Sequence, residues 1–419
     1  MNTKYPLFTT ILFCLLVCVG AVSAEGKEPE HVGDQLIAIA AKGELPRVVS
    51  GDKYTMTEIS STEVGRSEIV TYQVEKSGEI DMMQAIEQMQ SAHSTACVDY
   101  DYMYGAPGGY IGSGTVGNVA TGSSYSSSLY YDQWAFDQIN LDPTTQTGGA
   151  QTTIAILDAF QPNSGAIWSN QAVTFHTPIP LSDHQPANAQ NVELHGSLVT
   201  SLARSVAPDS EIMQVAVLNE WGVGTLSAIV QALDYVLEKH QTEGLPNLVV
   251  NMSFGTDQPD DCGILEAMLA DAKGNHDVVF VASAGNDSPA AGVAPALYPA
   301  SSPYVVAVAA SNSSHQMAAY SHDGLLMAPG GEHAESNVEQ PCDYADEVVV
   351  GLAPVSVGGG LHVICSVGTS FAAPFVSGAA ATMLGVNGAS ADVVIQTIDS
   401  NAEQNGDVLD LQSSAGVVQ

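Results

Sequence analysis

Residues 365–384 of this chain read CSVGTSFAAPFVSGAAATML and place Ser370 between Gly-Thr and a run of small apolar residues. Gly368 allows the backbone to turn sharply before the serine, and Pro374 fits a first helical turn. The small residues that follow keep the helix thin enough to cross a crowded core. The stretch predicts a helix whose N-terminus presents one exposed hydroxyl, and the alternative is a buried Ala-rich helix with a Ser/Thr cap.

Two segments upstream carry residues that can take part in catalysis. TTIAILDAF ends an apolar, β-branched run at Asp158, the carboxyl end of an expected parallel strand, where open α/β sheets place their sites. VELHGSLVTSLARSVAPDSEI places His195 at the start of an apolar helical pattern, so we expect the histidine to face outward. Taken singly, Asp158 is a turn former and His195 is one solvated histidine among eleven.

The order of these residues along the chain adds information. Asp158, His195 and Ser370 follow one another as Asp, His, Ser, whereas the triad of α/β-hydrolases runs Ser, Asp, His. The G-x-S-x-G turn of that fold is also absent around Ser370. The order therefore favours a different class of serine hydrolase.

Four segments resemble the subtilisin-like serine peptidases, whose triad has this chain order. They are ELHGS at 193–197, NMSFG at 251–255, VASAGND at 281–287 and GTSFAAPFVSG at 368–378. The resemblance covers most of residues 130–390. Two departures concern local loop geometry: Ala159 and Phe160 follow Asp158 where a small residue and Gly are usual, and HGSL replaces HGTH.

The resemblance implies a role for each residue. Ser370 would attack the scissile carbonyl, His195 would take its proton and pass it to the leaving amine, and Asp158 would hold the imidazole tautomer. Asn286 would donate its side-chain amide to the tetrahedral oxygen, together with the backbone N–H of Ser370. Without the triad, Asn286 beside Gly285 is a turn asparagine.

The resemblance also implies how a peptide substrate is held. In relatives, the segment that matches Ser253, Phe254 and Gly255 pairs with the extended substrate and lines its primary specificity pocket. Three acidic residues lie beyond this segment and are faintly similar to the acidic turn of kexin-like relatives, which select basic residues: Asp257, Asp260 and Asp261. Solvated loop carboxylates are the favoured interpretation in so acidic a chain.

The chain divides into four expected segments. Residues 1–24 have one lysine, an apolar core and small residues before Ala24, which predicts a signal peptide and a secreted protein. Residues 25–104 predict a small α+β unit that resembles, by position and size, the family's propeptide, a folding helper and inhibitor. Residues 105–128 form a Gly/Ser-rich linker, where self-cleavage is expected. Residues 129–419 form the peptidase domain.

Alternation of apolar strands and helices defines the expected fold of this last segment. Strands that are apolar throughout imply a sheet covered on both faces. We expect an α/β protein with the three-layer subtilisin-like fold and a mostly parallel central sheet, preceded by the small α+β propeptide domain.

Charge limits the partners. Asp plus Glu number 46 and Lys plus Arg 10, a net charge of −36. Such a surface repels nucleic acid and anionic membranes, so we expect neither as a partner. We expect protein or peptide substrates and a monomer inhibited by its own propeptide. A saline habitat, where salt screens self-repulsion, and a generally acidic secreted protein account for the charge equally well.

Cysteines and metal motifs are few. Export permits disulfides, and a bridge between Cys342 and Cys365 would tether the loop before Ser370 and leave Cys262 as the odd cysteine. No CxxC, HExxH or EF-hand loop occurs, so no metal site is specified and no cofactor is required. Subtilisin-like folds often hold calcium, but the sequence assigns no ligands to it.

The favoured function is a secreted serine endopeptidase with an Asp-His-Ser triad, made as a self-processed zymogen. A catalytically silent relative, an exported acidic binding domain with the same fold, is the rival from another class, and only Phe160 and Leu198 hint at it. An esterase is disfavoured by the triad order and by the segment that pairs with peptides.

Overall fold

The computed structural model describes residues 31–105 and 128–411, apart from gaps at 52, 78–80, 162–172, 178–180, 182, 184, 186–191, 246, 258, 289–291, 333–341, 343–345, 355–360, 386–388 and 405. The expected signal peptide, 1–24, and nearly all of the expected linker, 105–128, lie outside the described residues. In the part of the chain that is described, no helix has the length and apolarity to span a bilayer.

Residues 31–105 form a small α+β unit. Its elements are β1 (His31–Ala41), β2 (Val48–Ser50), β3 (Tyr54–Val64), β4 (Ser67–Lys76), α1 (Met82–Ala92) and β5 (Cys97–Gly105). The strands pair antiparallel in the order β2-β3-β4-β1-β5. Met82 and Met89 of α1 pack with Tyr72 in a hydrophobic core made of residues of this unit alone.

The rest of the described chain carries a parallel sheet with helices. Its elements are α2 (Ser128–Tyr131), α3 (Trp134–Gln138), β6 (Thr152–Ala159), β7 (Val173–His176), α5 (His195–Val206), β8 (Glu211–Leu218), β9 (Val223–Thr225), α6 (Leu226–Glu243), β10 (Asn247–Met252), α7 (Ile264–His276), β11 (Val279–Ser283), β12 (Val305–Ser311), β13 (Leu326–Pro329), β14 (Val349–Pro354), β15 (Leu361–Ser366), α8 (Thr369–Leu384) and α9 (Ala391–Gln404). Seven strands lie in the order β13-β12-β11-β10-β6-β8-β7 and pair in parallel, while β14 and β15 form an antiparallel pair.

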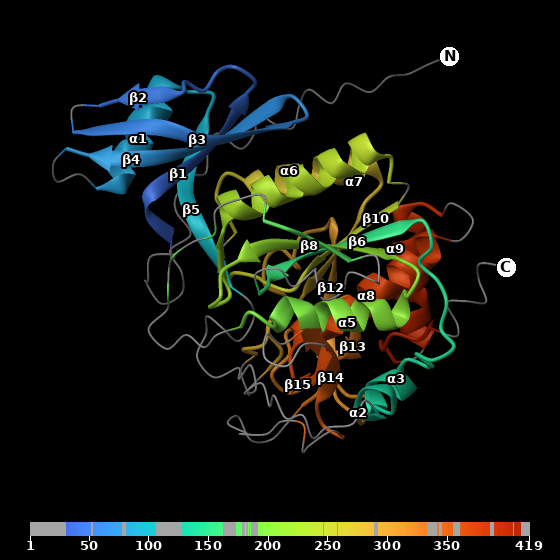
Figure 1. Cartoon of the computed structure of the whole chain (residues 1–419). Helices are drawn as coiled ribbons and strands as arrows, with labels where there is room; N and C mark the ends of the chain where they lie inside the picture. Colours follow the sequence, from blue (N-terminus) through green and yellow to red (C-terminus); the bar gives the residue numbers. More distant parts are fainter. Residues whose placement is uncertain are drawn as a thin grey trace, which may run out of the picture. The chain divides into compact units, whose positions relative to one another are not determined.

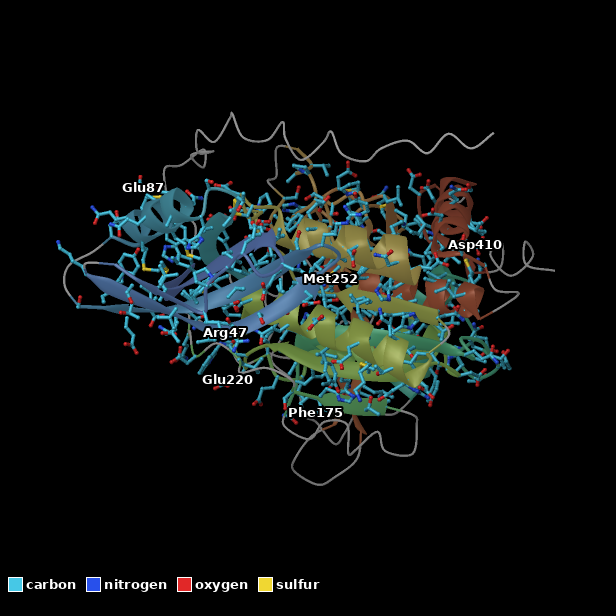
Figure 2. All side chains as sticks on the ribbon, turned by 90° about the horizontal axis from the view of Figure 1, so that it is seen from above. Arg47, Glu87, Phe175, Glu220, Met252 and Asp410 are labelled. Atoms are coloured by element: carbon cyan, nitrogen blue, oxygen red, sulfur yellow. A yellow bond between two sulfur atoms is a disulfide. The ribbon has the colours of Figure 1, made fainter. Side chains whose placement is uncertain are left out.

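The central strand β6 contributes to two hydrophobic cores. Ile154 and Ile156 pack in one core with α5 and α8, and Ala155 and Leu157 pack in the other with α6 and α7. The four side chains alternate because successive residues of a strand point to opposite faces. Figure 1 shows α6 and α7 on one side of the sheet and α5 and α8 on the other, and Met252 of β10 lies inside these layers (Figure 2). The expected three-layer fold is confirmed.

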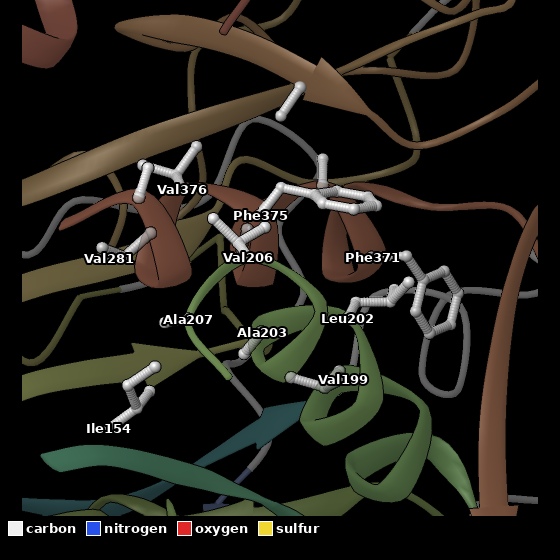
Figure 3. Close-up of a cluster of buried hydrophobic side chains, with 14 of the residues drawn as sticks. Ile154, Val199, Leu202, Ala203, Val206, Ala207, Val281, Phe371, Phe375 and Val376 are labelled. Carbon is white, nitrogen blue, oxygen red and sulfur yellow. The ribbon is translucent and has the colours of Figure 1, made fainter. Parts of the chain in front are cut away.

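Helices α5 and α8 approach closely because Gly378 has no side chain. A Cβ atom at residue 378 would lie 2.6 Å from Val206 Cβ and 2.8 Å from the Ala203 carbonyl oxygen, both on α5. Val206 and Leu202 of α5 lie opposite the phenylalanine side chains of α8 in the core between the helices (Figure 3). The contact matters for function because α5 begins with His195 and α8 begins next to Ser370.

Asp260 differs from the favoured interpretation of the sequence. Its side chain is 6% exposed and accepts a hydrogen bond from the backbone N–H of Ile264 at the start of α7. Burial raises the pKa of Asp260 to about 6, although the backbone hydrogen bonds lower it. The expectation of a solvated loop carboxylate is therefore wrong for Asp260, because the first N–H groups of a helix need acceptors.

A substitution at the contact between α5 and α8 tests this packing. We expect Gly378→Ala to lower the free energy of unfolding by about 1–3 kcal/mol, because the added methyl group overfills a dense core. The matched control is Gly274→Ala on α7, where a Cβ atom would meet nothing within 4 Å. The control should raise the free energy of unfolding by about 0.4–1 kcal/mol, because alanine restricts the unfolded chain more than glycine does. Urea denaturation of both variants in a Ser370→Ala background, which lacks the expected nucleophile, measures the difference, and equal effects would contradict the packing described.

Candidate active site

The end of β6 and the start of α5 supply a buried acid–histidine pair. Asp158 is the penultimate residue of β6 and His195 is the first residue of α5. His195 Nδ1 lies 2.7 Å from Asp158 Oδ1, and both side chains are at most 1% exposed. Because a carboxylate only accepts hydrogen bonds, the proton of the neutral ring is on Nδ1, and Nε2 has a free lone pair.

His195 does not face outward as expected, because other side chains cover it. The ring of Phe371 packs against the imidazole with a centroid distance of 5.1 Å. His195 Nε2 and Asp158 Oδ2 are buried and have no hydrogen-bond partner among the described residues. A buried nitrogen without a partner is costly, so this atom marks a place where a further group completes the site. Ser370 directly precedes Phe371, so the third expected residue lies at the neighbouring position of α8.

Ser370 is the second residue of α8, where the backbone N–H groups of the first turn have no acceptor within the helix. The turn before it depends on Gly368, whose φ of +148° is one that residues with side chains rarely adopt. The expected exposed hydroxyl is instead 1% exposed, because it lies against the end of β10. There the Oγ atom is 3.4 Å from the carbonyl oxygen of Ser253, to which it donates.

Pro374 lies inside α8 rather than in its first turn, and this has a consequence for Ser370. Proline has no N–H, so the carbonyl of Ser370 loses the donor four residues ahead. Ser253 Oγ donates to that carbonyl at 2.9 Å. Ser253 Oγ in turn accepts from Asn251 Nδ2 at 3.0 Å, and Asn251 Oδ1 accepts from Ser377 Oγ at 2.8 Å. This hydrogen-bonded chain, which the sequence did not predict, joins the end of β10 to α8 on both sides of the proline.

Asn286 lies on the loop after β11, beside the first turn of α8. Its Oδ1 atom accepts from the backbone N–H of Thr369 at 2.9 Å and from Thr369 Oγ1 at 2.8 Å. These bonds fix the amide so that Nδ2 is its donor side. A Cβ atom at Gly368 would lie 3.2 Å from Nδ2, so the donor faces the turn before Ser370. An oxygen held there would meet donors from a side chain and from a helix N-terminus.

A second acid–histidine pair anchors the loop that carries Asn286. His322 Nε2 lies 2.5 Å from Asp287 Oδ1, and His322 Nδ1 lies 2.7 Å from the Pro295 carbonyl oxygen. Both partners only accept hydrogen bonds, so the imidazolium form of the ring is the one that makes both contacts. Burial lowers the pKa of His322, but the hydrogen bonds and the charge of Asp287 outweigh it, and the pKa is raised. The stability that this pair contributes is complete between about pH 4 and about pH 6.5. It is lost as the pH rises through the raised pKa of His322, and also as the pH falls through the pKa of Asp287, which the hydrogen bond with His322 lowers.

The expected substrate-binding residues directly follow β10. Ser253 lies against Ser370, and Phe254 is fully buried with its ring edge-on to Tyr104, the centroids 6.3 Å apart. Gly255 exchanges two backbone hydrogen bonds with Gly105: the Gly105 N–H donates at 3.1 Å and the Gly255 N–H at 2.9 Å. The end of β5 thus pairs with this segment as an extended strand.

The four cysteines among the described residues form two disulfides. Cys342 and Cys365 are bonded, with Cα atoms 5.2 Å apart, in the region just before α8. Cys262 is not left over, because it is bonded to Cys97 of β5 with Cα atoms 5.6 Å apart. No pattern in the sequence indicated this pairing, since Cys97 and Cys262 lie 165 residues apart in segments with separate patterns. Within the described ranges, no group of three or more His, Cys, Asp or Glu side chains is arranged to hold a metal ion.

Fold and site together define a class: an α/β protein with a parallel sheet covered on both faces, an acid–histidine pair at its carboxyl edge, and a serine in the first turn of a core helix. The chain belongs to the subtilase family, whose model matches residues 137–416. The family that the sequence motifs indicated is therefore confirmed.

Several known proteins are similar to this chain. Subtilisin-like protease 7 of Trichophyton equinum is 32% identical over 197 residues, which cover 47% of this chain and 43% of that protein. Subtilisin E of Bacillus subtilis (strain 168) is 26% identical over 244 residues, 56% of each chain. The chain thus spans about half the length of these curated relatives. The crystal structure of a lanthipeptide protease matches 67% of this chain and 90% of its own with a TM-score of 0.50 and 22% identity, which supports the fold.

The hydrogen bond that compensates for Pro374 can be tested in a Ser370→Ala protein, which keeps the acceptor because it is a backbone carbonyl. We expect Ser253→Ala to lower the free energy of unfolding by about 1–3 kcal/mol, since it leaves a buried carbonyl without a donor. Pro374→Ala restores a backbone N–H four residues after the carbonyl of Ser370. The double substitution should therefore lower the free energy of unfolding by less than the sum of the two single substitutions. Urea denaturation of the parent, both single variants and the double variant measures this coupling, and additive effects would show that Ser253 does not replace the missing N–H.

Proposed function

We propose that the protein is a secreted serine endopeptidase that is made as a self-processed zymogen. The observation that carries this proposal is the buried 2.7 Å contact between His195 Nδ1 and Asp158 Oδ1, with Nε2 beside the start of α8 and lacking a hydrogen-bond partner among the residues that the structure describes. A histidine held in this tautomer has its basic nitrogen available for a neighbouring hydroxyl.

Each side chain then has a defined part in the proposed reaction. Ser370 Oγ attacks the carbonyl carbon of the scissile peptide bond while His195 Nε2 takes its proton, and the carboxylate of Asp158 stabilises the resulting imidazolium. The imidazolium returns the proton to the leaving amine, and water hydrolyses the acyl-enzyme by the same route. Asn286 Nδ2 and the backbone N–H of Ser370 donate to the oxygen that becomes negative.

The segment Ser253–Gly255 is the proposed binding site for the peptide chain. Its backbone offers pairing to an extended strand, which recognises many sequences because the hydrogen bonds involve only the main chain. Gly105 at the end of β5 pairs with Gly255 in this manner and also pairs with Val223 of β9 on its other side. A peptide substrate that binds here would have to displace the end of β5.

This competition supports the proposal that residues 25–104 act as a propeptide. Beyond the strand pairing, Asp101 of β5 is fully buried and accepts from the backbone N–H of Ser227 at 2.8 Å and from Ser227 Oγ at 2.6 Å. Burial raises the pKa of Asp101 to about 6, although the hydrogen bonds from Ser227 and Thr225 lower it. At neutral pH the carboxylate therefore lies at the N-terminus of α6, where the helix dipole favours a negative charge.

The proposals of export and of self-cleavage are based on the sequence. The signal peptide predicted for residues 1–24 leads out of the cytoplasm, and two disulfides agree with an oxidising compartment. Self-cleavage is proposed within the linker at 105–128, since no dibasic site lies there. We propose that the enzyme acts as a monomer without a required cofactor, and that any calcium it binds has no part in the chemistry.

Loss of the nucleophile tests the proposed function directly. We expect Ser370→Ala to leave the full-length chain uncut during an incubation in which the parent protein becomes two fragments, because no other side chain replaces the attacking hydroxyl. The loss of peptide hydrolysis should be on the order of 10⁶-fold, a magnitude taken from subtilisin. Reducing gel electrophoresis with N-terminal sequencing follows the cut, and circular dichroism confirms the fold. A Ser370→Ala protein that processes at the parental rate would remove Ser370 as nucleophile.

Loss of the amide donor should have a smaller effect. We expect Asn286→Ala to lower kcat by about 10²–10³-fold with little change in KM, the magnitude known for the oxyanion asparagine of subtilisin. The matched control is Asn275→Ala on the exposed surface of α7, which should leave both constants unchanged. Steady-state kinetics on one peptide substrate measure both, and a loss confined to KM would mean that Asn286 binds substrate without stabilising the transition state.

A further inference from the structure

The disulfide between Cys97 and Cys262 joins two parts of the chain that a processing cut would separate. Cys97 is the first residue of β5, in the N-terminal α+β unit, and Cys262 lies just before α7. The linker at 106–127 falls between the two cysteines. Any single backbone cut in the linker therefore yields two polypeptides that remain joined through sulfur.

We propose that this disulfide is a redox-sensitive tether, so that release of the N-terminal unit requires both the backbone cut and the reduction of Cys97–Cys262 by a dithiol. This inference rests on the proposed function, because only an inhibitory N-terminal unit gives its release a consequence. The cut alone would produce a two-chain protein whose binding segment is still occupied by the end of β5.

The contacts around the disulfide explain why the tether would maintain inhibition. Gly105 pairs with Gly255, Asp101 accepts from Ser227, and Asp99 Oδ2 accepts from the backbone N–H of Asp261 at 2.9 Å, next to Cys262. These bonds can open separately, but a tethered strand re-forms them from an effective concentration in the millimolar range. An N-terminal unit that is no longer tethered would be present only at the nanomolar concentration of the assay. This concentration is several orders of magnitude below the effective concentration of the tethered strand.

Exposure distinguishes this disulfide from the other one. Cys97 and Cys262 are both partly exposed, whereas Cys342 and Cys365 are 4% and 3% exposed. Thiol–disulfide exchange requires that a thiolate reaches one of the two sulfurs. A reductant in solution should therefore reduce Cys97–Cys262 first and leave the disulfide before α8 intact.

The chemistry of release is a balanced exchange. One thiolate of the dithiol attacks a sulfur of Cys97–Cys262 and forms a mixed disulfide, while the other protein sulfur leaves as a thiolate. The second thiol of the reductant then attacks the mixed disulfide and frees the second protein sulfur. Two electrons pass from the dithiol to the protein disulfide, so the reductant becomes a disulfide and the protein gains two thiols.

The tether itself is tested in the Ser370→Ala protein, so the result does not depend on catalysis. An added protease cuts the linker, and the product is analysed by non-reducing electrophoresis and by gel filtration, with and without dithiothreitol. Mass spectrometry after alkylation identifies which cysteines have been reduced. We expect one linked species without reductant, and two separable polypeptides with alkylated Cys97 and Cys262 after mild reduction. Separation without reductant would overturn the tether whether or not the protein is a peptidase.

The consequence for activity is tested with the parent protein after self-cleavage. We expect mild reduction to raise peptide hydrolysis by about 10²-fold at nanomolar enzyme, the lower end of what tethering contributes. The variant Cys97→Ser/Cys262→Ser should be active after its cut without reductant and should gain nothing from dithiothreitol. Full activity of the oxidised parent, or equal activation of the double variant, would overturn the redox control. Absence of any hydrolysis in all these proteins would instead contradict the proposed function.

Discussion

The buried hydrogen bond between Asp158 and His195 is the interaction on which the rest of the site depends. It joins the carboxyl end of β6 to the first residue of α5, and it leaves His195 Nε2 buried without a hydrogen-bond partner in the described part of the chain. A charge or a polar atom buried in this way is costly unless it serves a partner, so the surrounding structure must hold it in place. The core provides this support: Gly378 brings α8 against α5, and Phe371 covers the ring.

A second constraint acts on the serine. Pro374 removes the helical donor to the carbonyl of Ser370, and Ser253 replaces that donor from the end of β10. The residue that lines the expected binding segment therefore also positions the backbone of the expected nucleophile. The end of β5, the segment 253–255 and the start of α8 are joined within a few hydrogen bonds, so a displacement of one would change the positions of the others.

The sequence was sufficient to predict the layers of the fold and the strand end, helix start or loop at which each candidate residue lies. Strands that are apolar throughout predicted a sheet covered on both faces, and the seven-stranded sheet contributes to a core on each face. The burial of His195 was not predicted, because it arises from a contact with Phe371, which is distant in the sequence. The burial of Asp260 was not predicted either, although its contact with the N–H of Ile264, four residues ahead at the start of α7, is local in the sequence. The role of Asn251 was missed as well, although its place in the NMSFG segment was a signal. The pairing of Cys97 with Cys262 depends on how two separately patterned segments meet, and no spacing rule contains that information.

The most direct test of the central interaction is nitrogen-15 NMR of the histidine side chains in full-length Ser370→Ala protein, with His195 assigned by its absence in a His195→Gln variant. Near neutral pH, the account predicts that Nδ1 of His195 carries a proton protected from exchange with water, that Nε2 is unprotonated, and that Asp158→Ala removes the protection. A His195 signal with the proton on Nε2, or one that is unaffected by Asp158→Ala, would contradict it.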